Sequence, residues 1–261
     1  MTSWQWQTLN GSPYLTCSLL SDWQHGFMTR HFSPLAPQEI NKLLQPAATG
    51  YRLKQVHGNV VLTPTEATNT SEKEPETGWA MADGLISETA QQGVWVASAD
   101  CNPVLIADRH SGQVAAIHAG WRGTAQKIVP VAVQRFLDNG SSIEQLLVAI
   151  GPAIEGKVYQ VTNQVGAEVC QSILPELVGA EPELIVEKAL SLTDSPLLAD
   201  EQPGRIRLDV RQVNALQLQQ LGLSADQISI APHCTFQEPE QFFSYRREKL
   251  KRVQWSGIIS N

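Results

Sequence analysis

Four short apolar segments, each next to glycine or proline, constrain the fold of this chain more than any other feature. They are the runs GVWVASA (93–99), PVLIADR (103–109), QVAAIHAG (113–120) and LLVAIGP (146–152). A run of this length is strand-sized, and a nearly continuous apolar character is typical of strands that are buried on both faces. A membrane-spanning helix would need about 18 consecutive apolar residues. The sequence therefore predicts a buried β-sheet core and no membrane partner.

Helical patterns occur between and after these strands. The segment 124–137 has apolar residues at helical spacing, and Pro130 predicts a kink or a late start. This helix is expected to end at Asn139-Gly140, and Asp209 is placed to cap a second helix. The other expected elements are a helix over 164–174 and strands over 227–231 and 253–259.

Strands and helices are mixed without strict alternation, which favours a mixed α/β (α+β) fold. We expect a layered sandwich with a mixed central sheet and flanking helices. A doubly wound nucleotide-binding fold is not expected, because the sequence contains no GxGxxG motif. The polar tracts 66–76 and 191–204 are interpreted as surface loops that are too short for linkers. A chain of 261 residues, 42% hydrophobic and 17% charged, can bury one large core. The sequence predicts a single domain over 1–261.

The net charge and the first residues of the sequence bear on the binding partners of the protein and on its location in the cell. The 26 acidic and 19 basic residues leave a formal net charge of −7, so most of the surface repels a phosphate backbone and we expect no nucleic-acid partner. The first basic residue is Arg30, and the start lacks the charged and apolar regions of a secretory signal. The four cysteines are far apart and form no CxxC pair. We therefore expect a cytoplasmic protein with reduced thiols.

Three residues could together hold a metal ion. His57 and His118 lie beside glycines at the ends of strand-like runs, and Cys101 lies just before Pro103. Two imidazoles and a thiolate are a ligand set that zinc accepts, with a fourth position left open. The spacing of 44 and then 17 residues matches no compact zinc finger, so such a site would join three separate segments. The alternative is a buried thiol and two hydrogen-bonded histidines.

Charged residues near these three could complete a site. Arg122, between two glycines at the start of a helical segment, is suited to bind phosphate or carboxylate, although a salt bridge would explain it equally. Asp100 and Asp83 could orient a ligating imidazole or carry a proton, and the alternative for each is a turn or cap carboxylate. The basic run 246–252 is interpreted as a solvated face, and attraction of an anion is the functional alternative.

Eight sequence blocks resemble, in order, the YfiH or laccase-domain family of purine nucleoside phosphorylases. The blocks are GFMTRH (26–31), KQVHGNVV (54–61), ADGLIS (82–87), ASADCNPVLIAD (97–108), AAIHAGWRGTA (115–125), AIGPAIEGKVYQV (149–161), LDV (208–210) and CTFQEPEQFFSYRRE (234–248). The sequence departs from the family pattern in two places. His31-Phe32 stands where a glycine pair is common, and 155–158 (EGKV) lacks a common cysteine.

The resemblance implies a set of site residues. His57, Cys101 and His118 would bind zinc, with copper as the other candidate metal, and would act in catalysis together with Asp100. Arg122 and Arg30 would contact substrate or phosphate. Tyr245 and Arg246, in the last block, are further candidates for the pocket.

The resemblance also implies a reaction. A purine nucleoside such as adenosine, inosine, guanosine or 5′-methylthioadenosine would be cleaved with phosphate to the base and the (methylthio)ribose 1-phosphate. Adenosine deamination is an implied side activity, and we expect a monomer or a weak homo-oligomer. Three other readings stay open: a cysteine hydrolase or amidase that edits peptidoglycan precursors with Cys101 as nucleophile, a copper polyphenol oxidase, and a non-catalytic binding protein.

Overall fold

The computed structural model describes residues 3–261 and contains two six-stranded sheets. The first has the order β1 (Trp4–Leu9), β2 (Ser12–Cys17), β3 (His25–Met28), β15 (Gln254–Ile259), β7 (Gln92–Ser98), β4 (Thr49–Tyr51). The second has the order β14 (Ile228–Ile230), β10 (Leu146–Ile150), β8 (Asn102–Asp108), β9 (Val114–Ala119), β6 (Gly84–Ile86), β5 (Val61–Leu62). Most neighbours are antiparallel, but β4 runs parallel to β7, β5 to β6 and β14 to β10. Both sheets are therefore mixed.

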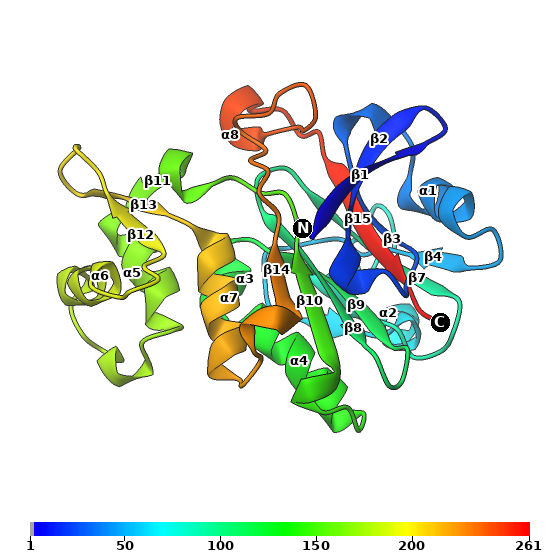
Figure 1. Ribbon diagram of the computed structural model, residues 1–261, viewed down its shortest axis with the longest axis horizontal. Helices are drawn as coiled ribbons and strands as arrows, with labels where there is room; N and C mark the ends of the chain where they lie inside the picture. Colours follow the sequence, from blue (N-terminus) through cyan, green and yellow to red (C-terminus); the bar gives the residue numbers. More distant parts are fainter. Residues whose placement is uncertain (1–2) are drawn as a thin grey trace.

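The two sheets pack face to face and helices cover their outer sides (Figure 1). One core cluster joins residues of both sheets, such as Phe27 and Val96 of the first with Leu105 and Ala116 of the second. The opposite face of the second sheet packs against α4 (Ile128–Asp138) and α7 (Val210–Gln220). The outer face of the first sheet packs against α1 (Pro37–Leu44). The result is a helix, sheet, sheet, helix sandwich.

A smaller lobe projects from one side, at the left of Figure 1. It contains a three-stranded sheet in the order β11 (Gln160–Thr162), β13 (Arg205–Leu208), β12 (Leu197–Ala199), with α5 (Asn163–Gln171) and α6 (Pro182–Leu190). Its core includes Val210 and Val213 of α7, whose Leu218 belongs to the core beneath the second sheet. Helix α7 therefore joins the lobe to the main sandwich.

The mixed α/β class and the four apolar strands are confirmed, as β7, β8, β9 and β10. The expected helix over 124–137 is interrupted, because Lys127 takes the left-handed conformation between α3 (Trp121–Ala125) and α4. Pro130 lies in the first turn of α4, where no intrahelical donor is lost, so the late start is confirmed. Asp209 caps α7 as expected, by accepting hydrogen bonds from the backbone of Arg211 and Gln212.

Three features differ from the expectation. The structure has two large sheets where a single central sheet was expected. The first sheet begins with the hairpin β1–β2, whose turn at Asn10-Gly11 has positive φ at both residues. The tract 66–76 begins inside a helix, α2 (Pro64–Asn69), because Thr63 and Glu66 form a capping box. The tract 191–204 contains β12.

Within residues 3–261, no helix combines the length and apolar character needed to cross a bilayer. The single domain stays a prediction.

Candidate functional site

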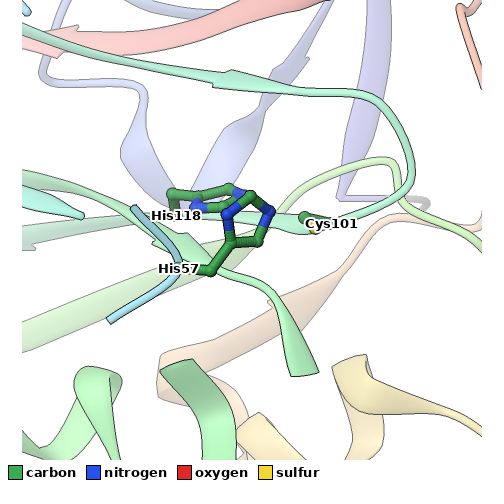
Figure 2. A group of neighbouring side chains, drawn as sticks. All are labelled: His57, Cys101 and His118. Atoms are coloured by element: carbon green, nitrogen blue, oxygen red, sulfur yellow. The ribbon is translucent and has the colours of Figure 1, made fainter. Parts of the chain in front are cut away.

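Strand pairing brings His57, Cys101 and His118 together. Strands β8 and β9 are antiparallel with Asn102 opposite Ala119, so Cys101, just before β8, lies beside His118 at the end of β9. His57 enters from the loop between β4 and β5. The potential ligand atoms of all three residues lie within 4.8 Å of one another, and Figure 2 shows their side chains converging. The two imidazole rings meet edge to face, with centroids 4.8 Å apart.

Asp83 holds the imidazole ring of His118 and the backbone of the loop that carries His57. Its carboxylate is fully buried and accepts a hydrogen bond of 2.9 Å from Nδ1 of His118. The same carboxylate accepts backbone hydrogen bonds from His57 at 2.8 Å and from Gly58 at 2.7 Å. The loop that carries His57 is thereby tied down, and Nε2 of His118 is left for the cluster. A carboxylate that fixes a histidine in this way is typical of metal sites.

The electrostatics of the cluster favour a thiolate. Burial alone would raise the pKa of the Cys101 thiol, but the positive charge and hydrogen bond of His118, with a hydrogen bond from His57, lower it to about 6. Burial alone would lower the pKa of His118, but Cys101 and Asp83 raise it to about 9. Without a metal the pair is therefore a thiolate beside an imidazolium. A deprotonated thiol is the form that binds metal, and His118 would release its proton on binding.

Gly120 leaves the space that the thiolate needs. A Cβ atom at this position would lie 2.9 Å from Sγ of Cys101 and 3.4 Å from Cδ2 of His57. The first distance is too short for a van der Waals contact, so any side chain here would displace the thiolate. The glycine of the HAGWRG segment is required by packing at the cluster.

A cavity of about 420 Å³ opens above the cluster. His57, Cys101 and His118 form one end, and its apolar wall consists of Leu53, Ala97, Ala99, Leu250, Val253 and Trp255. Four cationic side chains also line it: Arg52, Lys54, Lys251 and Arg252. No Asp or Glu is present among the described residues that line the cavity. The volume is in the range that encloses a small organic ligand.

Asp100 lies beside the cluster but is engaged elsewhere. Its carboxylate accepts hydrogen bonds of 2.7 Å from the Thr235 hydroxyl and 2.7 Å from the backbone N–H of Arg246. Asp100 thereby fastens the C-terminal segment next to Cys101, while Asp83 orients the imidazole. A small void of about 30 Å³ on this side of Cys101 is lined by Asp100, Asn102, Gly120, Trp121 and Tyr159, among others.

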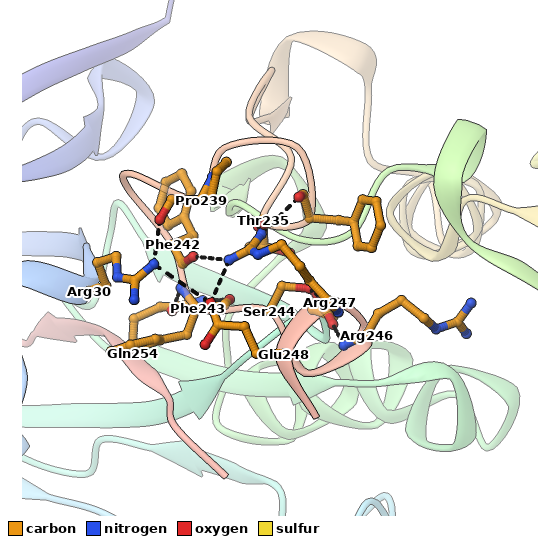
Figure 3. Close-up of polar contacts among 12 residues, drawn as sticks. Arg30, Thr235, Pro239, Phe242, Phe243, Ser244, Arg246, Arg247, Glu248 and Gln254 are labelled. Atoms are coloured by element: carbon orange, nitrogen blue, oxygen red, sulfur yellow. Dashed lines mark hydrogen bonds and ion pairs between the residues drawn. The ribbon is translucent and has the colours of Figure 1, made fainter. Parts of the chain in front are cut away.

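Neither predicted anion-binding arginine lines the larger cavity. The Arg122 side chain is exposed, with its guanidinium stacked 4.3 Å from the Trp121 ring centre. Arg30 donates a hydrogen bond to the Pro239 carbonyl and forms an ion pair of 3.6 Å with Glu248 (Figure 3). The substrate or phosphate roles of Arg122 and Arg30 stay predictions.

The basic run 246–252 is only in part a solvated face, because Lys249, Lys251 and Arg252 are exposed whereas Arg246 and Arg247 are half-buried. Arg247 is structural, because it donates to the carbonyls of Thr235, Phe236 and Phe242 (Figure 3). Arg246 donates to the Gln160 carbonyl and stacks 4.8 Å from the Tyr159 ring centre. Lys251 and Arg252 line the cavity, and so does Tyr245 from α8 (Tyr245–Glu248). Two further lining residues were not singled out in the sequence: Arg52, which lies outside the eight blocks, and Ser98, which lies within the block 97–108.

Comparison with known protein families identifies the family of this chain. Residues 38–259 match the family described as multi-copper polyphenol oxidoreductase laccase. The chain belongs to this family. A member from Synechocystis sp., named purine nucleoside phosphorylase, is 51% identical over 257 residues, which cover 98% of this chain and 97% of that protein. Purine nucleoside phosphorylase YfiH of Shigella flexneri is 32% identical over 197 residues, covering 76% of this chain and 68% of its own length. The family resemblance of the eight sequence blocks is confirmed.

Two solved structures share the fold of this chain. A crystal structure described as hypothetical protein YfiH of Bacillus licheniformis superposes with a TM-score of 0.77 at 23% identity, covering 95% of this chain and 96% of that one. YlmD from Geobacillus stearothermophilus also superposes with a TM-score of 0.77, at 24% identity, covering 98% of both chains. At this level of identity, the likeness supports the layered fold alone.

Proposed function

We propose that this protein is a zinc-dependent purine nucleoside phosphorylase. The observation that carries the proposal is the His57, Cys101 and His118 cluster at the end of a ligand-sized cavity. The names of the relatives from Synechocystis sp. and Shigella flexneri support the reaction class. The reduced cysteines and the use of phosphate are consistent with a cytoplasmic location.

The donor set suits zinc better than a group of copper ions. Two nitrogens and a thiolate leave one position open, which is typical of catalytic zinc. Zinc held by these residues would supply a Lewis acid for an oxygen of phosphate or nucleoside. In the described part of the chain, this is the one cluster of three such ligands, whereas multi-copper oxidation needs several copper centres. We therefore propose one zinc per chain, with Asp83 fixing the His118 ring.

The cavity walls match the parts of the reactants. The side chains of Leu250, Val253 and Trp255 offer an apolar surface for a purine ring, and the cationic side chains attract phosphate. In phosphorolysis a phosphate oxygen bonds to the anomeric carbon, while the glycosidic C–N bond breaks and the base leaves with its electron pair. Holding the two reactants in one enclosed site lowers the entropic cost of their meeting. We propose that Arg122, Arg30 and Asp100 act around this site, although Arg30 would first have to release Glu248.

Product analysis tests the reaction. Protein of defined metal content is incubated with adenosine, inosine, guanosine and 5′-methylthioadenosine, with and without phosphate, and products are separated by chromatography. Phosphorolysis gives free base only when phosphate is present, and deamination converts adenosine to inosine without phosphate. Cys101→Ala should lose zinc and base release together, whereas His110→Ala, in an exposed turn, should keep both. Absence of base from every nucleoside would refute the proposal.

A cysteine hydrolase is the second candidate, because a specific observation favours it. The Cys101 thiol with its lowered pKa, His118 and Asp83 form a Cys-His-Asp series like that of a nucleophilic enzyme. The two candidates respond oppositely to a chelator. Removal of zinc should abolish phosphorolysis, whereas a catalytic thiolate would remain active and be inactivated by alkylation.

A further inference from the structure

Arg52 is held in an unusual position in the cavity wall. Its guanidinium lies between two indole rings, 3.7 Å from the centre of Trp79 and 4.4 Å from that of Trp255. This stacking fixes the plane of the guanidinium. Its buried Nε has no hydrogen-bond partner in residues 3–261. Arg52 therefore lines the cavity as a cation whose plane is fixed and whose buried Nε has no partner in the described chain.

Ser98 provides a second unused polar group in the same wall. Ser98 is 3% exposed, lines the cavity, and its hydroxyl has no hydrogen-bond partner within the described chain. The Gln55 side chain links the two positions, because it exchanges hydrogen bonds of 2.7 and 2.8 Å with the backbone of Ala97. The segment that carries Arg52 is thus fastened to the end of β7, where Ser98 lies. Buried polar groups are normally paired, so two unpaired groups in one wall are available to hydrogen-bond a ligand that binds there.

The charge around these residues specifies the sign of that ligand. The chain as a whole carries a net charge of −7, yet Arg52, Lys54, Lys251 and Arg252 line this cavity without a carboxylate. Among the described residues none of the four forms an ion pair. A second cavity of about 300 Å³ adjoins this wall and shares Arg52, Lys251 and Arg252 with the first. A phosphoryl dianion can pair with these cationic groups, whereas a neutral nucleoside cannot.

We propose that Arg52 and Ser98 form a phosphoryl subsite in the cavity wall, with Lys251 and Arg252 adding positive charge beside it. The inference rests on the proposed function and deepens it, because it assigns an anion site that is separate from Arg122 and Arg30. The phosphoryl group is either the inorganic phosphate that attacks the nucleoside or a phosphate carried on the nucleoside itself. Arg52 donates from its guanidinium edge and Ser98 donates its hydroxyl proton.

Direct binding tests the subsite without relying on turnover. Inorganic phosphate and adenosine 5′-monophosphate are titrated separately into the zinc-loaded protein by calorimetry. Arg52→Gln should weaken binding of the matching anion on the order of tenfold or more, and Ser98→Ala by about threefold to tenfold. Zinc content should not change in either variant. The control is Arg205→Gln, which removes the same charge from β13, outside the cavity.

The two phosphate sources give different patterns. If inorganic phosphate occupies the subsite, its affinity falls in both variants and the KM for adenosine is unchanged. If the phosphate belongs to the nucleoside, the affinity for adenosine 5′-monophosphate falls instead. Ser98→Ala decides the matter if Arg52→Gln does not fold, because removing an unpaired hydroxyl breaks no internal hydrogen bond.

Wild-type affinity for both anions in Ser98→Ala would overturn the proposal, and so would an equal loss in Arg205→Gln. The proposed phosphorolysis fails independently: wild-type protein that releases no base, but whose phosphate binding depends on Arg52 and Ser98, would keep the subsite and reject the reaction.

Discussion

At the scale of single residues, the state of Cys101 depends on a chain of three groups. Burial lowers the pKa of His118, but the charge of Cys101 and the hydrogen bond to Asp83 raise it, and the resulting imidazolium stabilises the Cys101 thiolate. The buried thiols of Cys170 and Cys17 have no imidazolium beside them. Burial raises the pKa of Cys170 to about 12 and also raises that of Cys17. Cys101 is therefore the one thiolate of these three at neutral pH.

Alkylation of the metal-free protein by iodoacetamide should follow this thiolate. Because the pKa of Cys101 is lowered to about 6, the rate should rise as pH increases through about 6 and level off above it. An unperturbed cysteine would instead show its midpoint near pH ~8.5. Asp83→Asn should move the midpoint upward, since a less basic His118 holds less positive charge. Mass spectrometry identifies the labelled residue, and a midpoint near 8.5 in the wild type would contradict the thiolate assignment.

At the scale of elements, the turn after β9 shapes the metal cluster. Gly120→Ala would place a Cβ 2.9 Å from Sγ of Cys101, so we expect zinc affinity to fall about tenfold or more while the fold persists. Gly58→Ala is the matched control, because its Cβ would lie at an ordinary 3.6 Å from the Asp83 carboxylate. Competition with a chromogenic chelator measures both affinities. Equal zinc affinity in the two variants would show that Gly120 is dispensable.

The start of α7 gives a second prediction at this scale. Asp209 caps the helix and pairs at 2.7 Å with Arg211, whose side chain is 8% exposed. Asp209→Ala leaves a buried guanidinium without its partner, so unfolding free energy should fall by about 3–5 kcal/mol. Asp209→Asn retains a capping oxygen and should lose less. Urea unfolding measures the change, with the exposed Asp226→Ala as control. A loss below about 0.5 kcal/mol in Asp209→Ala would contradict this account.

At the scale of the whole molecule, the apolar cores are built without the proposed metal cluster. They consist of hydrophobic side chains of the two sheets, the helices and the smaller lobe, and Cys101 belongs to none of them. A chain of 261 residues buries enough surface to fold without a metal.

Chelation of the proposed zinc should therefore remove the proposed activity without unfolding the protein. Far-UV circular dichroism should stay unchanged after zinc removal, and the melting temperature should fall only by the amount that bound zinc stabilises the native state. Activity should return when zinc is added back. A cooperative loss of secondary structure on chelation would instead make the zinc a folding element, as in small zinc domains.

The sequence by itself determined the elements whose signals are local. The apolar runs became β7, β8, β9 and β10, and Asp209 predicted the start of α7, because burial on both faces and helix capping involve neighbouring residues only. The motifs around His57, Cys101 and His118 also indicated a metal cluster. A comparable local signal, Asn10-Gly11, could have identified the first hairpin.

Only the tertiary structure decided which strands share a sheet and which side chains contact one another. A strand that is apolar on both faces can join either of two sheets, so the runs could not predict two stacked sheets instead of one. Asp83 and Asp100 were equivalent candidates in sequence, and only the fold placed Asp83 against His118 and Asp100 against Thr235. Arg52 and Ser98 are 46 residues apart, and only Ser98 belongs to one of the eight blocks, yet both line the same cavity. Such pairings depend on contacts between distant segments, which packing creates and local sequence does not encode.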